Sequence, residues 1–216
     1  MNSSFRVVFL TFIFSCFIVI IHGQRFVSGP CPVISPPENF DKSRFFGHWI
    51  ETEKTPSIFD LMMRCMRVDY SDDKDGSINV DVRGVSLAGI PVAIQGDGLV
   101  QDISKNGFYT VRYGFGMPIQ GTQITVIDTD YTEYALVYSC TNSLLSGVFH
   151  SEYVWVLSRD GSLSNPTRQN VYEKLDNLKI NRSGLQLSDR TGCPTNFTRE
   201  EVDSAVQTTP VPIQKE

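Results

Sequence analysis

The stretch NFDKSRFFGHWIE, from Asn39 to Glu51, decides how the rest of this chain is interpreted. Two phenylalanines, a glycine and a histidine lead to Trp49, and a proline-broken segment precedes them all. A tryptophan buries a large apolar ring but keeps one N–H group that needs a partner. Such a cluster suits a packing nucleus, a binding surface or half of an active site, and the remaining sequence has to decide among the three.

The first 23 residues have the pattern of a secretory signal peptide. One basic residue, Arg6, precedes the apolar run VVFLTFIFSCFIVII, and the small residue Gly23 follows it. The run is too short to span a bilayer comfortably, which makes a membrane anchor the weaker interpretation. We expect residues 1–23 to be a signal peptide, the protein to be secreted and extracellular, and residues 24–198 to form one domain. The polar tail 199–216 is expected to be disordered.

The charge balance excludes one class of partner. The chain carries 19 Lys and Arg against 24 Asp and Glu, a formal net charge of −5, and its basic residues form no patch. Proteins that bind phosphate backbones need such a patch. We therefore expect no nucleic-acid partner.

Four cysteines lie beyond the leader, and an even number in a secreted chain indicates two disulfides. They are Cys31, Cys65, Cys140 and Cys193, for which arithmetic alone allows three pairings. Zinc sites usually use closely spaced cysteine pairs, whereas the spacing here is wide and irregular. The sequence therefore predicts disulfides and no metal.

Two sequons for N-linked glycosylation occur in polar segments. They begin at Asn181 and Asn196, whereas the NPT triplet at Asn165 is excluded by its proline. We expect Asn181 and Asn196 to be glycosylated in a secreted chain.

The middle of the chain has the pattern of an all-β barrel. Short β-branched and aromatic runs alternate with turn residues at roughly 8–12-residue spacing. No helical pattern interrupts them, which favours an eight-stranded, antiparallel, up-and-down barrel that closes on itself and leaves no exposed edge. The expected strands cover residues 46–54, 64–71, 78–86, 92–103, 108–115, 123–129, 133–140 and 149–159.

One helix is predicted after the last strand. Asn165 can cap it, Pro166 suits its first turn, and Val171, Leu175 and Leu178 form one apolar stripe. A short extended segment, GLQLS, follows the helix.

The last long strand indicates where this helix lies. Tyr153, Trp155 and Leu157 share one face, and Val154 and Val156 share the other. A strand that is apolar on both faces is covered on both. We therefore expect one face to line the barrel and the other to lie beneath the helix.

Three motifs in this pattern resemble the conserved segments of the lipocalin family. They are GHWIE (47–51), TDYTEY (129–134) and the lone Arg159 after the eighth strand. The longer stretches NFDKSRFFGHWIETEKTPSIF, TDYTEYALVYSC and WVLSR look like the apolipoprotein D branch, which includes insect bilin-binding proteins and Lazarillo-type lipocalins. This resemblance runs from about Cys31 to Cys193 and implies an eight-stranded barrel with one helix packed outside.

The resemblance also implies structural roles. It pairs Cys31 with Cys140 and Cys65 with Cys193, and it places Arg159 over the ring of Trp49 at the closed end of the barrel. A guanidinium on an indole face contributes roughly 0.5–2 kcal/mol. The structural motif as a whole comprises Gly47, Trp49, Thr129, Asp130, Tyr131 and Arg159, with Asp130 expected to hold a turn between strands.

Catalytic chemistry has little support. Beyond the leader only His48 and His150 remain as histidines, without a nucleophile motif beside either. One lipocalin subgroup is enzymatic through a free cysteine inside the barrel, but the resemblance places all four cysteines in disulfides. We expect no enzyme activity, no cofactor and no haem ligation, although a free Cys65 would restore a candidate nucleophile.

The barrel interior is the remaining candidate site, because an eight-stranded barrel can hold one small ligand. Strand alternation turns Tyr153 and Trp155 inward. The apolipoprotein D pattern adds further lining residues, some of which could simply fill the core: Tyr70, Val82, Met117, Val137 and Ser139. Val82 stands where some relatives carry a polar side chain, which favours fatty acyl or pigment ligands over steroid-like ones.

Two loops expected at the open end are unusually apolar, SIFDLMM (57–63) and SLLSGVF (143–149). They could fold as a lid, or they could contact a membrane or lipoprotein surface through residues such as Phe59 and Leu145. Met117, near the mouth, could reduce lipid hydroperoxides by becoming a sulfoxide, which would protect against lipid peroxides.

The sequence therefore predicts a secreted, glycosylated carrier of a small hydrophobic ligand, active in lipid binding and transport. Fatty acids or other lipids come first as ligands, a bilin pigment second, and a sterol or retinoid third. The alternative is an interaction protein, such as a cell-surface or guidance lipocalin, whose outer face matters more than its pocket.

Overall fold

The computed structural model describes residues 26–57, 63–73, 77–100, 107–114, 121–143 and 147–194. Several sequence predictions lie outside these residues and stay predictions: the signal peptide 1–23, the tail 199–216, Phe59, Met117, Leu145 and Asn196.

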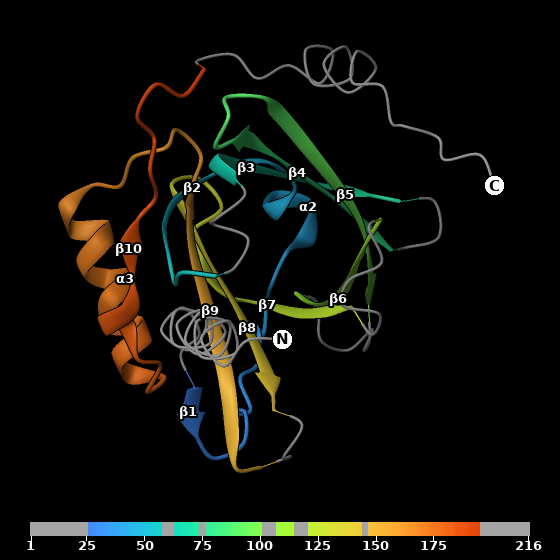
Figure 1. Ribbon diagram of the computed structural model, residues 1–216. Coiled ribbons are helices and arrows are strands. Elements are labelled where there is room, and N and C mark those ends of the chain that lie inside the picture. The colour runs from blue at the N-terminus through green and yellow to red at the C-terminus, as the bar shows by residue number, and fades with distance from the viewer. Residues whose placement is uncertain are drawn as a thin grey trace, which may run out of the picture.

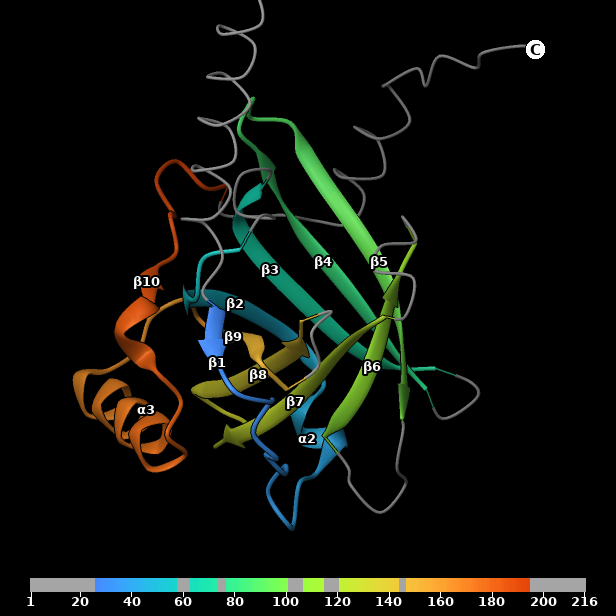
Figure 2. The same ribbon diagram turned by 60° about the horizontal axis from the view of Figure 1, so that its bottom comes forward.

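Eight antiparallel strands form a closed ring, which confirms the predicted barrel (Figures 1 and 2). Each strand pairs with its neighbours in sequence, and β9 also pairs with β2, which closes the ring. The strands are β2 (Gly47–Lys54), β3 (Met63–Asp72), β4 (Ile78–Ser86), β5 (Pro91–Val100), β6 (Phe108–Tyr113), β7 (Thr122–Thr129), β8 (Tyr134–Asn142) and β9 (Phe149–Ser158).

Two short strands extend this sheet. The strand β1 (Phe26–Ser28) pairs with the start of β9, and β10 (Gln186–Leu187) pairs with the end of β2. The extended segment predicted after the helix is thus confirmed as β10, whereas β1 was not predicted, because three residues are too few to show an alternating pattern.

A single helical turn, α2 (Lys42–Phe45), lies inside the stretch 39–51. Its N-cap is Asp41, whose carboxylate accepts hydrogen bonds from the backbone N–H groups of Ser43 and Arg44. Figure 2 shows α2 at the end of the barrel where β6 begins. The sequence analysis missed this turn, because four residues carry no helical period.

The C-terminal helix α3 (Asn165–Asn177) packs outside the barrel as predicted (Figure 1). Its N-cap, however, is Ser164 and not Asn165: the Ser164 hydroxyl accepts a hydrogen bond from the Thr167 N–H group. Asn165 is the first helical residue, so its predicted capping role was wrong. Pro166 lies in the first turn, where its missing N–H group leaves no bond unmade. A 3₁₀ turn, η2 (Arg182–Gly184), follows the helix.

Two hydrophobic clusters confirm the predicted alternation of the last strands. The inner cluster fills the barrel around Trp49 and includes Ala135, Val137 and Leu157. The outer cluster lies between the barrel and α3 and is formed chiefly by Leu136, Tyr138, Val154, Val156, Val171 and Leu175.

A buried ion pair also attaches α3 to the barrel. The Glu53 carboxylate of β2 accepts hydrogen bonds from Arg168 Nε (2.8 Å) and the Tyr172 hydroxyl (2.7 Å), both on the helix. Glu53 is buried, and losing either donor would leave a charge with too few partners. The helix is therefore fixed in one position against the end of β2.

The closed end of the barrel is built around Trp49, which is fully buried. Its ring stacks on Phe45, and its Nε1–H group donates to the Phe45 carbonyl at 2.8 Å. The guanidinium of Arg159 lies over the indole ring, 3.6 Å from the centroid. The predicted pairing of Trp49 with Arg159 is confirmed, and these residues form the floor that closes this end of the barrel.

Arg159 also satisfies backbone groups across this floor. Its guanidinium donates to the carbonyls of Arg44, Phe45, Phe46, His48 and Tyr131. Gly47 adopts a φ of +100° beneath it, and a Cβ there would lie 3.5 Å from Arg159 Nη1. Only glycine adopts this backbone conformation without strain, which explains the first residue of the GHW motif.

The TDY motif forms the turn between β7 and β8. The Asp130 carboxylate accepts three hydrogen bonds, from the N–H groups of Thr132, Glu133 and Tyr134, which confirms its predicted role. The Thr129 hydroxyl accepts from Tyr131 N–H and donates to the Tyr134 carbonyl. Since Arg159 Nε donates to the Tyr131 carbonyl, the three sequence motifs meet at one place.

Replacing Arg159 by alanine should lower the free energy of unfolding by about 2–4 kcal/mol, because it removes the cation over Trp49 and leaves carbonyl groups without donors. Chemical denaturation measures this loss. The control is Arg182→Ala, since Arg182 also stacks on a ring, that of Tyr172, but is exposed. Equal effects of the two substitutions would contradict the role given to Arg159.

Candidate functional site

A cavity of about 380 Å³ lies above the floor. It opens at the end of the barrel opposite α2, where β2, β4, β6 and β8 end. All the predicted lining residues that the structure describes lie in its wall: Tyr70, Val82, Val137, Ser139, Tyr153 and Trp155. Only Met117 of the predicted set lies outside the described residues.

About two thirds of the lining residues that the structure describes were not predicted from the sequence. The additional lining residues come mainly from β3 to β7 and include Met66, Val68, Val80, Ile94, Tyr113 and Ile124. Strand alternation could have found several of them, because Val68 and Val80 stand two positions from Tyr70 and Val82 on the same strands. The wall is thus mostly hydrocarbon, with a few phenol and hydroxyl groups.

Two tyrosines define the chemistry of the deeper wall. The Tyr70 ring is buried and lies 4.8 Å from the Phe45 ring centroid, so it rests on the floor. Burial raises the pKa of Tyr70, and burial raises the pKa of Tyr113 to about 12. Both phenols therefore stay neutral at ordinary pH and present O–H groups, not charges, to the cavity.

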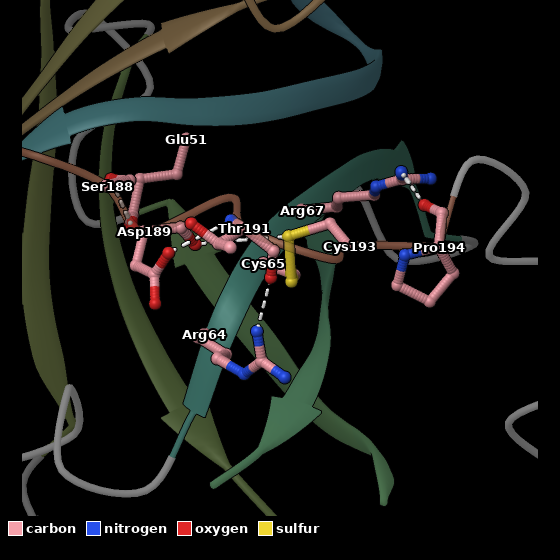
Figure 3. The surroundings of a disulfide bond; sticks show 9 residues. All are labelled: Glu51, Arg64, Cys65, Arg67, Ser188, Asp189, Thr191, Cys193 and Pro194. Atoms are coloured by element: carbon pink, nitrogen blue, oxygen red, sulfur yellow. Dashed lines mark hydrogen bonds between the residues drawn. A yellow bond between two sulfur atoms is a disulfide. The ribbon is translucent and has the colours of Figure 1, made fainter. Parts of the chain in front are cut away.

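The wall beside the cavity is completed by a segment far away in sequence (Figure 3). The strands β2 and β3 pair with each other only from Gly47–Ile50 to Arg67–Tyr70, near the floor. Beyond these pairs the segment 186–194 lies against both strands, with β10 paired to β2 and the Asp189 carbonyl accepting from Cys65 N–H on β3. Without it the barrel would have a gap in its side.

Side chains and a disulfide hold this segment in place (Figure 3). The Ser188 hydroxyl donates to the Glu51 carboxylate at 2.8 Å. Arg64 and Arg67 donate to the carbonyls of Thr191 and Pro194. The predicted disulfide between Cys65 and Cys193 is present.

The second predicted disulfide fixes the N-terminal segment. Cys31 is bonded to Cys140 on β8, and Cys31 N–H donates to the Asn142 side chain at the end of that strand. Cys31, Cys65, Cys140 and Cys193 are thus all bonded in disulfides. A cross-link that closes a loop of this length contributes about 2–5 kcal/mol to stability.

Neither His48 nor His150 lines the cavity. His48 Nδ1 is 3.1 Å from Asp69 Oδ1, and buried His150 Nδ1 is 2.8 Å from the Gly29 carbonyl. Among the residues that the structure describes, no three His, Cys, Asp or Glu side chains gather as a metal ion would require. Within the same residues no helix is long and apolar enough to cross a membrane.

The predicted glycosylation site at Asn181 is exposed on the surface. Its side-chain oxygen accepts from Ser183 N–H at the start of η2. Glycosylation of this residue stays a prediction.

Comparisons with known proteins agree with this architecture. A family model described as a lipocalin-like domain matches residues 40–188. Apolipoprotein D of Macaca fascicularis is 33% identical over 174 residues, which cover 80% of this chain and 88% of that protein. Insecticyanin-B of Manduca sexta is 29% identical over 167 residues, covering 76% and 79%.

Solved structures match as well. The insecticyanin from the tobacco hornworm Manduca sexta superposes with a TM-score of 0.66 at 26% identity, covering 83% of this chain and 93% of that one. Lobster apocrustacyanin A1 superposes with a TM-score of 0.62 at 19% identity, covering 77% and 93%, a likeness of fold alone.

The raised pKa of Tyr113 gives a pH dependence with a definite sign. Its contribution to stability is complete below the unfolded value of about 10 and is lost as the pH rises towards about 12. We expect the free energy of unfolding of the wild type to fall between these two pH values. In Tyr113→Phe, which has no phenol to ionise at this position, the fall should be smaller by an amount on the order of 2 kcal/mol. Denaturation curves at both ends of the range measure this, and equal losses in the two proteins would contradict it.

Proposed function

We propose that this chain, which belongs to the lipocalin family, is a secreted carrier that holds one small hydrophobic ligand in its barrel cavity. The observation that carries the proposal is the mostly apolar cavity of about 380 Å³ above a closed floor. A cavity of this size and character suits a small molecule. The floor makes the mouth the route of entry and exit.

The mechanism is reversible burial of apolar ligand surface. Each Å² removed from water contributes about 25 cal/mol, from which the costs of association are subtracted. We rank the ligands as long-chain fatty acids or other lipids first, a bilin pigment second, and a sterol or retinoid third. Val82 in the wall supports this ranking, because it supplies no polar partner for a steroid.

Secretion is part of the same proposal. The signal-peptide pattern of residues 1–23 supports it, as do the two disulfides, since such bonds persist in oxidising compartments. N-glycosylation at Asn181 and Asn196 would follow from passage through the same route.

Cavity-filling substitutions test the carrier function. The double variant Val82→Phe with Val137→Phe should weaken binding of a fluorescent fatty acid at least tenfold, since it fills the space with protein atoms. Leu99→Phe is the control, because Leu99 lies on the exposed face of β5. If the double variant is folded and binds as tightly as the control, the cavity is not the site.

The fluorescence of the protein itself provides a second readout. The chain holds two tryptophans, Trp155 in the cavity wall and Trp49 beneath Arg159. Ligand binding should change the emission of Trp155, and Trp155→Phe should abolish that change.

We also propose that the open rim contacts a lipid surface. Four apolar side chains are exposed on its described hairpins: Leu87 (68%), Ile90 (52%), Val148 (48%) and Phe149 (43%). Apolar groups clustered at one end of a protein can enter the boundary region of a bilayer.

The double variant Leu87→Lys with Ile90→Lys should bind less to phosphatidylcholine vesicles in a flotation assay, with fatty-acid affinity unchanged. Leu99→Lys, near the closed end of β5, is the matched control and should float like the wild type. Equal flotation of all three proteins would contradict contact through the rim.

A further inference from the structure

The cavity has two chemically different sides. The strands β3, β4 and β5 present mainly hydrocarbon, through Met66, Val68, Val80, Val82 and Ile94. Arg67 and the Tyr70 phenol are the polar exceptions on this side. The strands β7, β8 and β9 present oxygen atoms in the upper part of the wall, through Thr122, Ser139, Thr141, Ser151 and Tyr153. A ligand that fits both sides of the cavity has one apolar edge, and its opposite edge carries one polar group.

Ser139 is the member of the polar side that lacks a partner. It is 2% exposed, and its hydroxyl makes no hydrogen bond in the part of the chain that the structure describes. Burying a hydroxyl that makes no hydrogen bond costs free energy and therefore does not stabilise the fold. Of the described polar atoms in this condition, it is the one that belongs to the cavity wall.

The carboxylate in the described cavity wall is in a different condition. Glu51 also lines the cavity, but its Oε1 atom contacts Lys54 Nζ at 2.8 Å and accepts from the Ser188 hydroxyl. Its charge is therefore compensated within the protein. Arg67, the cation of the described wall, donates through Nη2 to the Pro194 carbonyl. The Ser139 hydroxyl is thus the described wall group that a ligand would satisfy.

The position of Ser139 limits what that ligand group can be. On β8 it stands two residues below the exposed Thr141, so it lies roughly 7 Å inside the rim. Tyr153 is its cross-strand partner on β9, and Val137 lies next below it on the inner face. A carboxylate buried at this depth would need a cation, which a serine does not supply. The group must be neutral, and a hydroxyl can both donate and accept.

We propose, resting on the carrier function above, that Ser139 selects lipids that carry a neutral hydroxyl or carbonyl oxygen part-way along an apolar chain. Any charged end group of such a lipid stays at the mouth in water. The chain lies against β3, β4 and β5, and the internal oxygen exchanges a hydrogen bond with Ser139. An unsubstituted chain of equal length leaves that hydroxyl unpaired and binds more weakly.

A pair of ligands tests the selection. Affinities of the full-length protein for a mid-chain hydroxyoctadecanoic acid and for unsubstituted octadecanoic acid should differ by about fivefold in favour of the hydroxylated acid, as expected for one net hydrogen bond. In Ser139→Ala the preference should vanish, with affinity for the unsubstituted acid unchanged or improved. Thr132→Val, exposed in the turn between β7 and β8 and outside the cavity wall, is the control and should keep the preference.

Stability separates this role from a structural one. Because the Ser139 hydroxyl has no partner among the described residues, Ser139→Ala should leave the midpoint of chemical unfolding unchanged or higher. A lower midpoint would identify a structural hydroxyl and overturn the proposal.

The binding outcomes also separate the two proposals. If both acids bind equally well to the wild type, the carrier function stands and selection by Ser139 is wrong. If neither acid binds, the lipid-carrier function fails as well.

Discussion

The guanidinium of Arg159 against the ring of Trp49 is the contact on which the rest of the structure depends. It joins the strand that begins the barrel to the residue that follows the last strand, so it forms only when the ring of strands has closed. The same side chain donates hydrogen bonds to carbonyls of the turn α2 and of the turn between β7 and β8. One residue thus couples closure of the ring of strands to closure of the floor. Because of the floor, the barrel is closed at one end and open at the other.

The cavity requires a continuous wall as well as a floor. The strands β2 and β3 separate above their first four pairs, and the segment 186–194 lies against both of them there. Its disulfide to Cys65 and its hydrogen bonds to both strands make it part of the wall, although more than a hundred residues separate it from either strand. The cavity therefore depends on contacts between the two ends of the domain.

Much of this could be predicted from the sequence, because strand alternation and the three motifs report on local and family-wide constraints. The inward positions of Tyr153 and Trp155 and both disulfides were confirmed. The misses have physical reasons. The short elements α2 and β1 have no period, and Ser164 and Asn165 are both good caps whose choice depends on where the helix axis begins. That the Ser139 hydroxyl lacks a partner among the described residues is a property of its surroundings, which no sequence pattern records.

The central claim is that the cavity holds one small apolar molecule. Mass spectrometry of an organic extract, made from protein isolated without denaturation from its native source, tests it most directly. We expect one hydrophobic compound in an amount close to equimolar with the protein, carrying a neutral oxygen within its skeleton. An extract without any hydrophobic compound, from protein that also takes up none of the lipids offered to it, would show that the cavity is not a carrier site.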